Sequence, residues 1–429
     1  MKDVLLYMVI SLILSKREYF RVYILGKSIN WSATIIMILI AASVMCWMSV
    51  FEAGVPQSDN VRVIVRVTSW LAKSELSRFG SVEVEIPELR AVVIEIPRTA
   101  LKHIATLPFV EYVEEDKLVI AYGEVQWNVE LINATHVWSE YNASYGDAAY
   151  GYHPDIDIAV LDTGVDYRHK DLSGSVSWCV VSLRNGKTFY RGTDLKNCAD
   201  GNGHGTHVTG IIAARLNGFG VAGVAPKVTI YAVKVLGPSG SGYVSDVAKG
   251  IVEATKGPDG LENTADDADV ISMSLGGPSS SILEAAVKYA YNRGAVLVAA
   301  SGNEGASTPS YPAYYSEVIA VGAVDSNYNV PAWSNRNSDV VAPGVNILST
   351  WPNNRYAYAS GTSMACPHVS ATVALIQALR LSGGYGKLSP SEVRSVLSST
   401  ALDLGFQGYD AVYGYGVVNV YGAVESALS

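Results

Sequence analysis

Three side chains whose types combine in nucleophilic catalysis lie far apart in this sequence: Asp162, His204 and Ser363. Asp162 directly follows the apolar run of residues 156–161. A carboxylate at the end of a buried strand needs a hydrogen-bond donor, and an imidazole N–H can supply one. An isolated Asp at such a position more often caps the following turn, so its interpretation as a catalytic group depends on its partners.

The histidine that best fits the role of a general base is His204. Gly201, Gly203 and Gly205 surround it and allow the chain to bend sharply before a helix begins with small residues. His207 lies one helical turn further on, so we expect it to point into the core. His204, at the exposed start of the helix, is therefore the candidate base.

The candidate nucleophile, Ser363, and a candidate oxyanion donor, Asn303, complete the set. Ser363 precedes an apolar helix, and Pro367 is tolerated only in the first turn of such a helix, which places Ser363 near the helix N-terminus. Backbone N–H groups there stabilise a nearby oxyanion. Asn303 follows another apolar strand, and its amide can donate to the same oxyanion. Taken singly, a helix-capping serine and a turn-forming asparagine would also explain these residues.

The order of the three residues along the chain narrows the chemistry. Asp, His and Ser follow one another in that order, and no Gly-x-Ser-x-Gly motif surrounds Ser363. Both features distinguish this chain from two other widespread groups of serine hydrolases. The combination predicts acyl transfer through a serine nucleophile.

The elements that must position these residues form an α/β domain. Short runs rich in Val, Ile and Ala alternate with helical segments, which predicts a parallel sheet covered by helices on both faces. The expected strands are residues 156–161, 228–235, 270–273, 295–300 and 318–321. Functional residues of such sheets gather at the carboxyl ends of the strands, where Asp162 and Asn303 stand.

The bulk composition excludes some classes of protein. The 429 residues are 49% hydrophobic and 17% charged, which suits one large or two modest folded domains and not a disordered chain. The formal net charge of -9 argues against a nucleic-acid partner, which requires a basic surface.

Two of the four cysteines, Cys179 and Cys198, flank a polar insertion that has the composition of a surface loop. If the protein is exported, they can close one disulfide, worth roughly 3 kcal/mol for a loop of about this size. The alternative is a pair of free thiols. Cys366 lies in an apolar helix and is expected to be a small core residue.

Residues 1–58 have the character of a targeting segment. Two apolar runs, residues 4–14 and 31–51, are separated by a basic stretch, as in an export signal. The second run is close to the ~20 residues that span a bilayer, and no Ala-x-Ala cleavage site follows it. A signal peptide and a retained membrane anchor both remain open.

A second small unit follows, at residues 59–122. Its alternating and helical patterns come in the order β-α-β-β-α-β, which is typical of a ferredoxin-like fold. It contains no nucleophile or metal-ligating cluster, so we expect it to have no catalytic role.

Several motifs resemble those of one family, the subtilisin-like serine proteases (peptidase S8 type). Asp162-Thr-Gly-Val-Asp166, His204-Gly-Thr-His-Val-Thr-Gly210 and Gly361-Thr-Ser-Met-Ala-Cys-Pro-His368 are similar to its three active-site signatures. Ser274-Leu-Gly-Gly277 and Ser301-Gly-Asn303 resemble its substrate-pocket and oxyanion segments. The similarity runs from about residue 126 to residue 427, and residues 60–122 resemble, more loosely, the family's propeptide.

The resemblance implies a fold and a division of the chain. The fold is a subtilisin-like, doubly wound, mostly parallel α/β sheet flanked by helices, preceded by a small α+β ferredoxin-like propeptide. Residues 1–58 would be the signal peptide or anchor, 59–122 the propeptide and 123–429 the catalytic domain.

The resemblance also implies the activity: a secreted serine endopeptidase made as a zymogen and self-processed near Tyr122. The propeptide would assist folding and act as an intramolecular inhibitor. Proteins and peptides would be the substrates, with broad specificity and an apolar preference before the scissile bond. The enzyme would be a monomer, and would meet a membrane only if the N-terminal segment is retained.

The family's peptide-binding segments map onto two stretches of this chain and a pocket. The residues implied are Gly240, Ser241, Gly242, Ser274, Leu275, Gly276, Gly302 and Ser310. Ser310 would form the floor of the primary pocket, and Glu304 at its rim would favour some basic side chains as well.

Calcium is the cofactor that the resemblance implies, in a structural role. The family's tight site would map onto Asp171, Arg215, Asn217, Phe219 and Val221. The family often adds an upstream Gln, and this chain has Glu124 in the aligned region instead. An acidic insertion would either bind a second calcium or be a solvated run of charges; its residues are Asp259, Asp266, Asp267 and Asp269.

Two other functions compete with the endopeptidase. The first is a membrane-tethered binding domain without activity, which loss of a triad residue would favour, but all three are present. The second is a hydrolase that acts on esters, against which the long peptide-binding segments argue.

Overall fold

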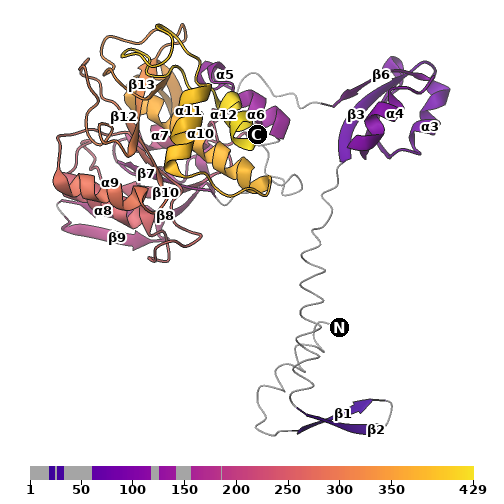
Figure 1. The fold of residues 1–429 in the computed structure, drawn as a ribbon, viewed down its shortest axis with the longest axis horizontal. Helices are drawn as coiled ribbons and strands as arrows, with labels where there is room; N and C mark the ends of the chain where they lie inside the picture. The colour runs from indigo at the N-terminus through magenta and orange to yellow at the C-terminus, as the bar shows by residue number, and fades with distance from the viewer. Residues whose placement is uncertain (1–18, 25–26, 33–59, 117–124, 142–155, 185) are drawn as a thin grey trace. The chain divides into compact units, whose positions relative to one another are not determined.

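The computed structural model describes residues 19–24, 27–32, 60–116, 125–141, 156–184 and 186–429 (Figure 1). Most of the two N-terminal apolar runs, and the expected processing site near Tyr122, lie outside these residues. The chain divides into two compact units, Met1–Lys117 and Leu118–Ser429.

The first unit contains a four-stranded antiparallel sheet in the order β4-β5-β3-β6. Its strands are β3 (Asn60–Val67), β4 (Ser81–Ile86), β5 (Ala91–Pro97) and β6 (Val110–Glu115). Short helical turns cross between them: η1 (Trp70–Ala72), α3 (Lys73–Leu76), η2 (Pro87–Leu89), η3 (Arg98–Ala100) and α4 (Leu101–Ile104). Alternate residues of β3, such as Val63 and Val65, are buried, as the alternating sequence predicts. A separate hairpin pairs β1 (Tyr19–Ile24) with β2 (Lys27–Ser32).

The second unit is built on an eight-stranded sheet in the order β14-β13-β12-β11-β7-β10-β8-β9. All neighbours are parallel except β8 and β9. The strands are β7 (Asp157–Asp162), β8 (Val176–Leu183), β9 (Thr188–Gly192), β10 (Thr229–Lys234), β11 (Val270–Met273), β12 (Val296–Ala300), β13 (Val318–Val324) and β14 (Val340–Pro343). The five strands predicted from the sequence are all present.

Helices cover both faces of this sheet (Figure 1). Ile158 and Val160 of β7 face a core shared with α7 and α10, whereas Ala159 and Leu161 face a second core shared with α8 and α9. The first face carries α5 (Trp127–Leu131), α6 (Ala134–Tyr141), α7 (His204–Ala213), α10 (Thr362–Ser382), α11 (Pro390–Thr400) and α12 (Val420–Leu428). The second carries α8 (Val244–Thr255) and α9 (Ser281–Tyr291).

The strand order creates a crevice at the carboxyl edge of the sheet. The chain passes from β7 to the β8–β9 side, returns in β10 beside β7, and then continues in β11 on the other side of β7. Such a reversal leaves a gap between the loops that follow neighbouring strands, which is where open α/β sheets bind ligands. A further hairpin, β15 (Ile347–Trp351) and β16 (Arg355–Ala359), packs against α7.

Two sequence-based expectations about local structure were wrong. The segment between Cys179 and Cys198 is not simply a surface loop, because it contributes half of β8 and all of β9 to the sheet. Pro367 lies at the sixth residue of α10, just beyond the first turn. A hydrogen bond described below compensates for its missing N–H.

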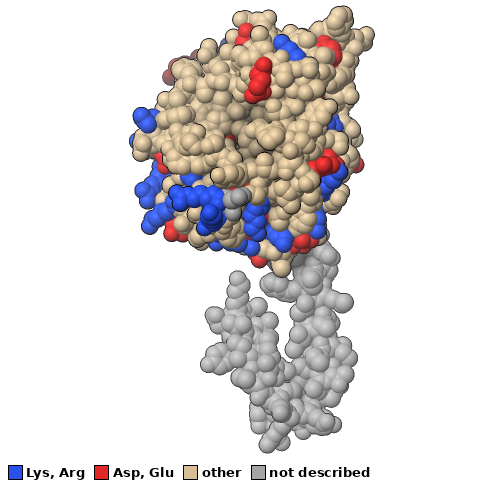
Figure 2. Space-filling view, turned by 90° about the vertical axis from the view of Figure 1, so that its left-hand side faces the viewer, with Lys and Arg blue, Asp and Glu red and all other residues tan. Residues whose placement is uncertain are grey.

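Charged side chains lie mainly at the surface. On the face in Figure 2, uncharged side chains cover most of the area, and Lys and Arg gather toward its lower edge. Among the described residues, the one helix long and apolar enough to cross a membrane is α10, and 89% of its apolar 18-residue window is buried inside the protein. Its burial is that of a core helix.

Candidate active site

Asp162 and His204 form the central pair of the site. Asp162 is the last residue of β7 and is buried, while His204 is the first residue of α7. The Nδ1 atom of His204 lies 2.8 Å from Oδ1 and 2.9 Å from Oδ2 of Asp162. Asp162 Oδ1 also accepts the backbone N–H of Thr163 at 2.7 Å, which fixes the orientation of the carboxylate. The Nε2 atom of the imidazole is thereby left for another partner.

The surroundings of His204 make it a better base. Burial lowers the pKa of His204, but the charge and hydrogen bond of Asp162, with the charge of Asp200, outweigh burial and raise the pKa above its ordinary value. His207, as predicted, is buried, and its Nε2 lies 3.0 Å from the carbonyl oxygens of Ile347 and Ala357. Burial lowers the pKa of His207 to about 4, so this second histidine remains neutral.

Ser363 lies in the first turn of α10, in the same cleft as His204. Helices α7 and α10 pack against each other, and the two residues line a common cavity of about 440 Å³. In this rotamer the Ser363 hydroxyl donates a long bond, 3.4 Å, to the carbonyl oxygen of Ser274. The serine therefore stands at a helix N-terminus beside an imidazole held by a buried carboxylate.

The helical turn that carries Ser363 is held by a hydrogen bond that compensates for Pro367. Because Pro367 has no N–H, the carbonyl of Ser363, four residues earlier, loses its usual helical partner. The hydroxyl of Ser274 donates to that carbonyl at 2.8 Å. The segment that follows β11 is thus joined directly to the residue that carries the candidate nucleophile.

Asn303 is oriented by the neighbouring helix start. Its Oδ1 accepts the backbone N–H of Thr362 at 2.8 Å and the Thr362 hydroxyl at 3.0 Å. Since the amide oxygen is occupied by these donors, the exposed side chain presents its NH₂ group beside Ser363, and both residues line the same cavity. This geometry suits a donor to an oxyanion formed at Ser363.

The predicted peptide-binding segments border the cleft. Residues 240–242 and 274–276 line the 440 Å³ cavity together with His204 and Ser363. A second cavity, of about 220 Å³, is lined by Ser310, Gly302 and Glu304. A side chain on Gly302 would come within 3 Å of Ser310, Glu304 and Asn335, which explains why glycine is needed there. A third cavity, of about 290 Å³, lies on the other side of the serine and includes Trp351.

Hydrogen-bond donors surround the carboxylate of Asp171, the first predicted calcium ligand. The Asp171 carboxylate accepts Asn217 Nδ2 at 3.2 Å and the backbone N–H of Val221 at 3.1 Å, so the loop of residues 215–221 closes over it. A Cβ on Gly220 would approach Asp171 Oδ2 to 2.2 Å. Carboxylate, amide and backbone oxygens in such a cradle match the ligands of Ca²⁺.

The side chain of Gln126 contacts the end of this loop from the segment upstream. Its Oε1 accepts the backbone N–H of Ala222 at 3.3 Å, directly after the loop. Glu124, the substitute suggested by the sequence, lies outside the described residues. The described residues include no group of three or more His, Cys, Asp or Glu that could hold a metal ion, so backbone and amide oxygens would have to supply most of the ligands.

Most carboxylates of the acidic insertion accept hydrogen bonds from backbone N–H groups of the same insertion. Asp259 accepts the N–H of Leu261, and Asp266 accepts the N–H of Asp259. Asp267 accepts the N–H of Asn263 at 2.7 Å. Asp269 forms an ion pair with Lys387. These bonds order the backbone of the insertion, and the second calcium site stays a prediction.

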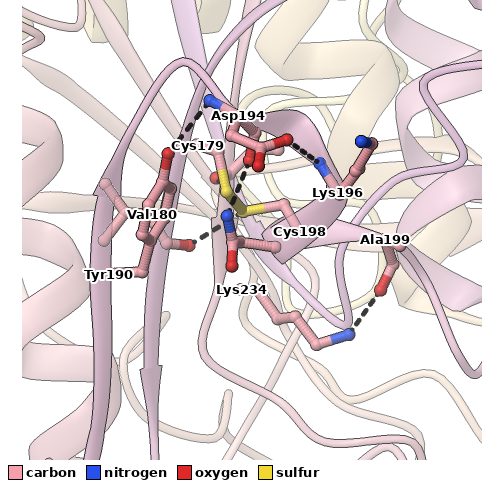
Figure 3. The surroundings of a disulfide bond; sticks show 10 residues. Cys179, Val180, Tyr190, Asp194, Lys196, Cys198, Ala199 and Lys234 are labelled. Atoms are coloured by element: carbon pink, nitrogen blue, oxygen red, sulfur yellow. Dashed lines mark hydrogen bonds between the residues drawn. A yellow bond between two sulfur atoms is a disulfide. The ribbon is translucent and has the colours of Figure 1, made fainter.

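Cys179 and Cys198 form a disulfide with a Cα–Cα distance of 5.8 Å (Figure 3). It joins β8 to η6 (Leu195–Cys198), and both cysteines are buried. Cys366 is a buried free thiol, as expected. Residue 198 lies only six positions before His204, so the disulfide holds the segment that leads into the catalytic helix.

Sequence reasoning overlooked one residue in that segment, Asp200. Its carboxylate accepts hydrogen bonds from Thr163 and from the turn that begins α7. The signal was present in the sequence, because an acidic residue stands four positions before the candidate base.

The fold and the site together define a class of protein. An Asp–His pair at the carboxyl edge of a doubly wound sheet, with a serine at a helix N-terminus in the same cleft, is the arrangement of a serine hydrolase. The order Asp, His, Ser along the chain separates it from hydrolases with other folds.

Comparison with known proteins specifies the family. The model of the subtilase family (Peptidase_S8) matches residues 154–416. Subtilisin DY of Bacillus licheniformis is 46% identical over 285 residues, which cover 65% of this chain and 94% of that protein. Subtilisin Savinase of Lederbergia lenta is 45% identical over 273 residues, covering 63% and 91%. Subtilisin E of Bacillus subtilis strain 168 is 38% identical over 355 residues, covering 81% and 84%.

The chain belongs to the subtilase family and is a subtilisin-like serine endopeptidase. The predictions of the family, of the α/β fold and of the enzyme class are confirmed.

Proposed function

We propose that this protein is an exported endopeptidase, made as an inactive precursor, that cleaves proteins with Asp162, His204 and Ser363. The observation that carries the proposal is the pair of short contacts between His204 Nδ1 and the buried Asp162 carboxylate, in a cleft shared with Ser363. Two peptide-binding segments border the same cleft, which favours extended polypeptides over simple esters.

The proposed reaction follows from the positions of these atoms. Ser363 Oγ attacks the peptide carbonyl while His204 Nε2 accepts its proton. Asp162 stays ionised and stabilises the imidazolium through Nδ1–H. Asn303 Nδ2 and the backbone N–H of Ser363 stabilise the oxyanion. His204 then protonates the leaving amine, and water releases the acyl group from Ser363 by the reverse sequence of proton transfers.

Substrates would bind by adding a strand to the cleft. An extended peptide would pair with residues 240–242 on one side and 274–276 on the other, and so contribute mainly backbone hydrogen bonds. The 220 Å³ cavity over Ser310 would accept a large apolar side chain before the scissile bond. Because backbone contacts dominate, we propose broad sequence specificity. We also propose that the enzyme is a monomer, as the family resemblance implies.

Removing the Asn303 amide tests the oxyanion assignment. We expect Asn303→Ala to lower kcat by about 10²–10³-fold with little change in KM, a magnitude known for the corresponding donor of subtilisin and not calculated for this chain. Steady-state hydrolysis of a chromogenic peptide measures the effect. The control is Asn327→Ala, at an exposed loop asparagine. An Asn303→Ala enzyme with a raised KM and unchanged kcat would contradict the assignment.

Residues 59–122 are proposed to be the propeptide. The alignment with subtilisin E covers 81% of this chain, more than residues 123–429 can supply, so it extends into the first unit. The unit has a compact β-α-β-β-α-β sheet of its own. We propose that it assists folding, inhibits the enzyme, and is removed by cleavage near Tyr122. Residues 1–58 would direct export and would either be removed or remain as an anchor.

A time course of intact mass tests the precursor proposal. The wild-type precursor should lose an N-terminal piece ending near Tyr122 and then digest casein, whereas Ser363→Ala should remain full length and inactive. Adding mature wild-type enzyme to the Ser363→Ala precursor then separates cleavage within one molecule from cleavage between molecules. If both precursors stay intact in the presence of calcium, and neither digests casein, the proposed function is wrong.

Calcium is proposed to stabilise the loop of residues 215–221 through the side chains of Asp171 and Asn217. The backbone carbonyls of Arg215, Phe219 and Val221 would complete the set. Excess EDTA should lower the melting temperature on the order of 10 °C, if the ion is present at ~1,000 times its Kd. Asp171→Asn should melt lower than wild type and respond less to EDTA. Differential scanning calorimetry of the Ser363→Ala protein avoids self-digestion. An unchanged melting temperature in EDTA would contradict the calcium proposal.

A further inference from the structure

Asp200, which no motif of the family resemblance includes, accepts five hydrogen bonds at the start of the catalytic helix. Its Oδ1 accepts the backbone N–H groups of Asn202 and Gly203, each at 2.9 Å. Its Oδ2 accepts the backbone N–H of Thr206 at 2.9 Å and the Thr206 hydroxyl at 2.6 Å. The Thr163 hydroxyl supplies the fifth bond, to Oδ1, at 2.9 Å. One carboxylate therefore organises the whole turn around His204.

Thr163 connects this turn to the other half of the Asp–His pair. Thr163 directly follows Asp162, and its hydroxyl accepts the backbone N–H of Gly205 at 2.9 Å while donating to Asp200. The backbone N–H of Thr163 donates to Asp162 at 2.7 Å. Asp200 and Thr163 together fix the distance between the end of β7 and the start of α7, and hence between Asp162 and His204.

The backbone that carries Asp200 is itself anchored. Cys198 is held by the disulfide to Cys179, and its carbonyl accepts the N–H of Val165 at 2.9 Å. The carbonyl oxygen of Ala199 accepts a hydrogen bond from the ammonium group of Lys234 at 2.7 Å (Figure 3). Lys234 is buried at the end of β10, where it pairs in register with Asp162. Residues 198–200 are thus fixed to β8, to β10 and to the segment that follows β7.

The carboxylate is also charged. Burial raises the pKa of Asp200, but the hydrogen bonds from Thr206, Gly203 and Asn202 outweigh burial and hold the pKa below its ordinary value. Four titratable groups lie together here. Asp162 and Asp200 favour the charged form of His204, and the buried His207 remains neutral. Asp200 is a second negative charge acting on the imidazole.

We propose that Asp200 is a positioning residue for His204: it holds the first turn of α7 against Asp162, and its charge favours the imidazolium that forms during catalysis. This inference rests on the proposed function of His204 as the base. It concerns the geometry and electrostatics of that base, and it adds no group that touches the substrate.

The test compares Asp200→Asn with wild type in a pH series of kcat and KM on a short chromogenic peptide. The asparagine NH₂ would face backbone N–H donors, so the turn would shift, and kcat should fall by about 10–10²-fold while KM changes little. Loss of the charge lowers the pKa of His204, and since the imidazole must be neutral to accept a proton, the acid limb of kcat/KM should move to lower pH. A purely structural role would not move that limb.

Two further variants separate the contributions. Thr163→Val removes the bridging hydroxyl but keeps the Asp200 charge, so kcat should fall without a shift of the acid limb. Asp194→Asn, at an acidic residue in the same segment that caps η6, should match wild type in both respects. Circular dichroism and melting temperature establish that each protein is folded.

The outcomes distinguish this inference from the proposed function. An inactive wild-type enzyme would overturn the proposed function. If the wild type is active and the Asp200→Asn variant has the same kcat and the same pH profile, only the proposed role of Asp200 is overturned. If Asp200→Asn does not fold, Thr163→Val decides, and wild-type kcat in that variant would contradict the positioning role.

Discussion

Ser363→Ala is expected to lower kcat for peptide hydrolysis by about a millionfold, the size of the loss known for the nucleophile of subtilisin and not a value calculated for this chain. The reason is that, among the described residues, Ser363 carries the one hydroxyl that lines the His204 cavity from the first turn of α10. The residual rate should still exceed that of water alone, because Asn303 and the peptide-binding segments remain. Initial rates on a chromogenic peptide, at high enzyme concentration, measure it.

The matched control for this replacement is Ser382→Ala, at the other end of the same helix. Ser382 donates its hydroxyl to the carbonyl of Ala378, four residues earlier, and lies far from the cleft along α10. Ser382→Ala should keep the wild-type kcat. A Ser363→Ala enzyme that retains more than a few per cent of wild-type activity, after contaminating protease is excluded by a serine-directed inhibitor, would contradict the nucleophile assignment.

Asp162→Asn is expected to lower kcat by about 10⁴-fold, as the equivalent change does in serine proteases of unrelated fold. The hydrogen bonds explain why. Asp162 Oδ1 accepts the N–H of Thr163, and the asparagine oxygen would keep that bond. The new NH₂ group would then face His204 Nδ1. Since the NH₂ group is a donor, Nδ1 could pair with it only by accepting its hydrogen bond. This tautomer carries its proton on Nε2 and is unable to accept the proton of Ser363.

The pH dependence of Asp162→Asn gives a second readout. The charge and hydrogen bond of Asp162 help to raise the pKa of His204, so removing the charge lowers that pKa. The acid limb of kcat/KM should therefore move to lower pH, even as the plateau falls. Asp325→Asn, in a turn where the carboxylate accepts loop N–H groups, is the control. A variant with the wild-type plateau would show that Asp162 does not set the tautomer.

The central sheet could be predicted from the sequence, and the candidate site residues could be named from it, because both depend on local patterns. The catalytic roles of those residues stay predictions. Continuous apolar runs are required in a parallel strand that is buried on both faces, so β7 and β10–β13 were visible directly. The catalytic candidates were visible because reactive residue types stood next to strand ends or among glycines. The alternation of β3 likewise matched its buried face.

Other features were hidden because they depend on contacts between distant segments. β9 pairs only on one side, at the edge of the sheet, so its polar sequence had the composition of a loop. Pro367 is accommodated beyond the first turn because Ser274, 89 residues away, satisfies the carbonyl of Ser363. Asp200 was overlooked because its bond to Thr163, which connects it to Asp162, joins two segments that lie far apart in the sequence.

The central claim is that His204 and Asp162 activate Ser363 as a nucleophile, and reaction with a fluorophosphonate at neutral pH tests it most directly. The processed enzyme is treated with the reagent, and intact mass and peptide mapping locate the adduct. The account predicts one adduct per molecule, on Ser363, formed with loss of activity, and none in the His204→Ala variant. An adduct on another serine, or complete inactivation without modification of Ser363, would contradict it.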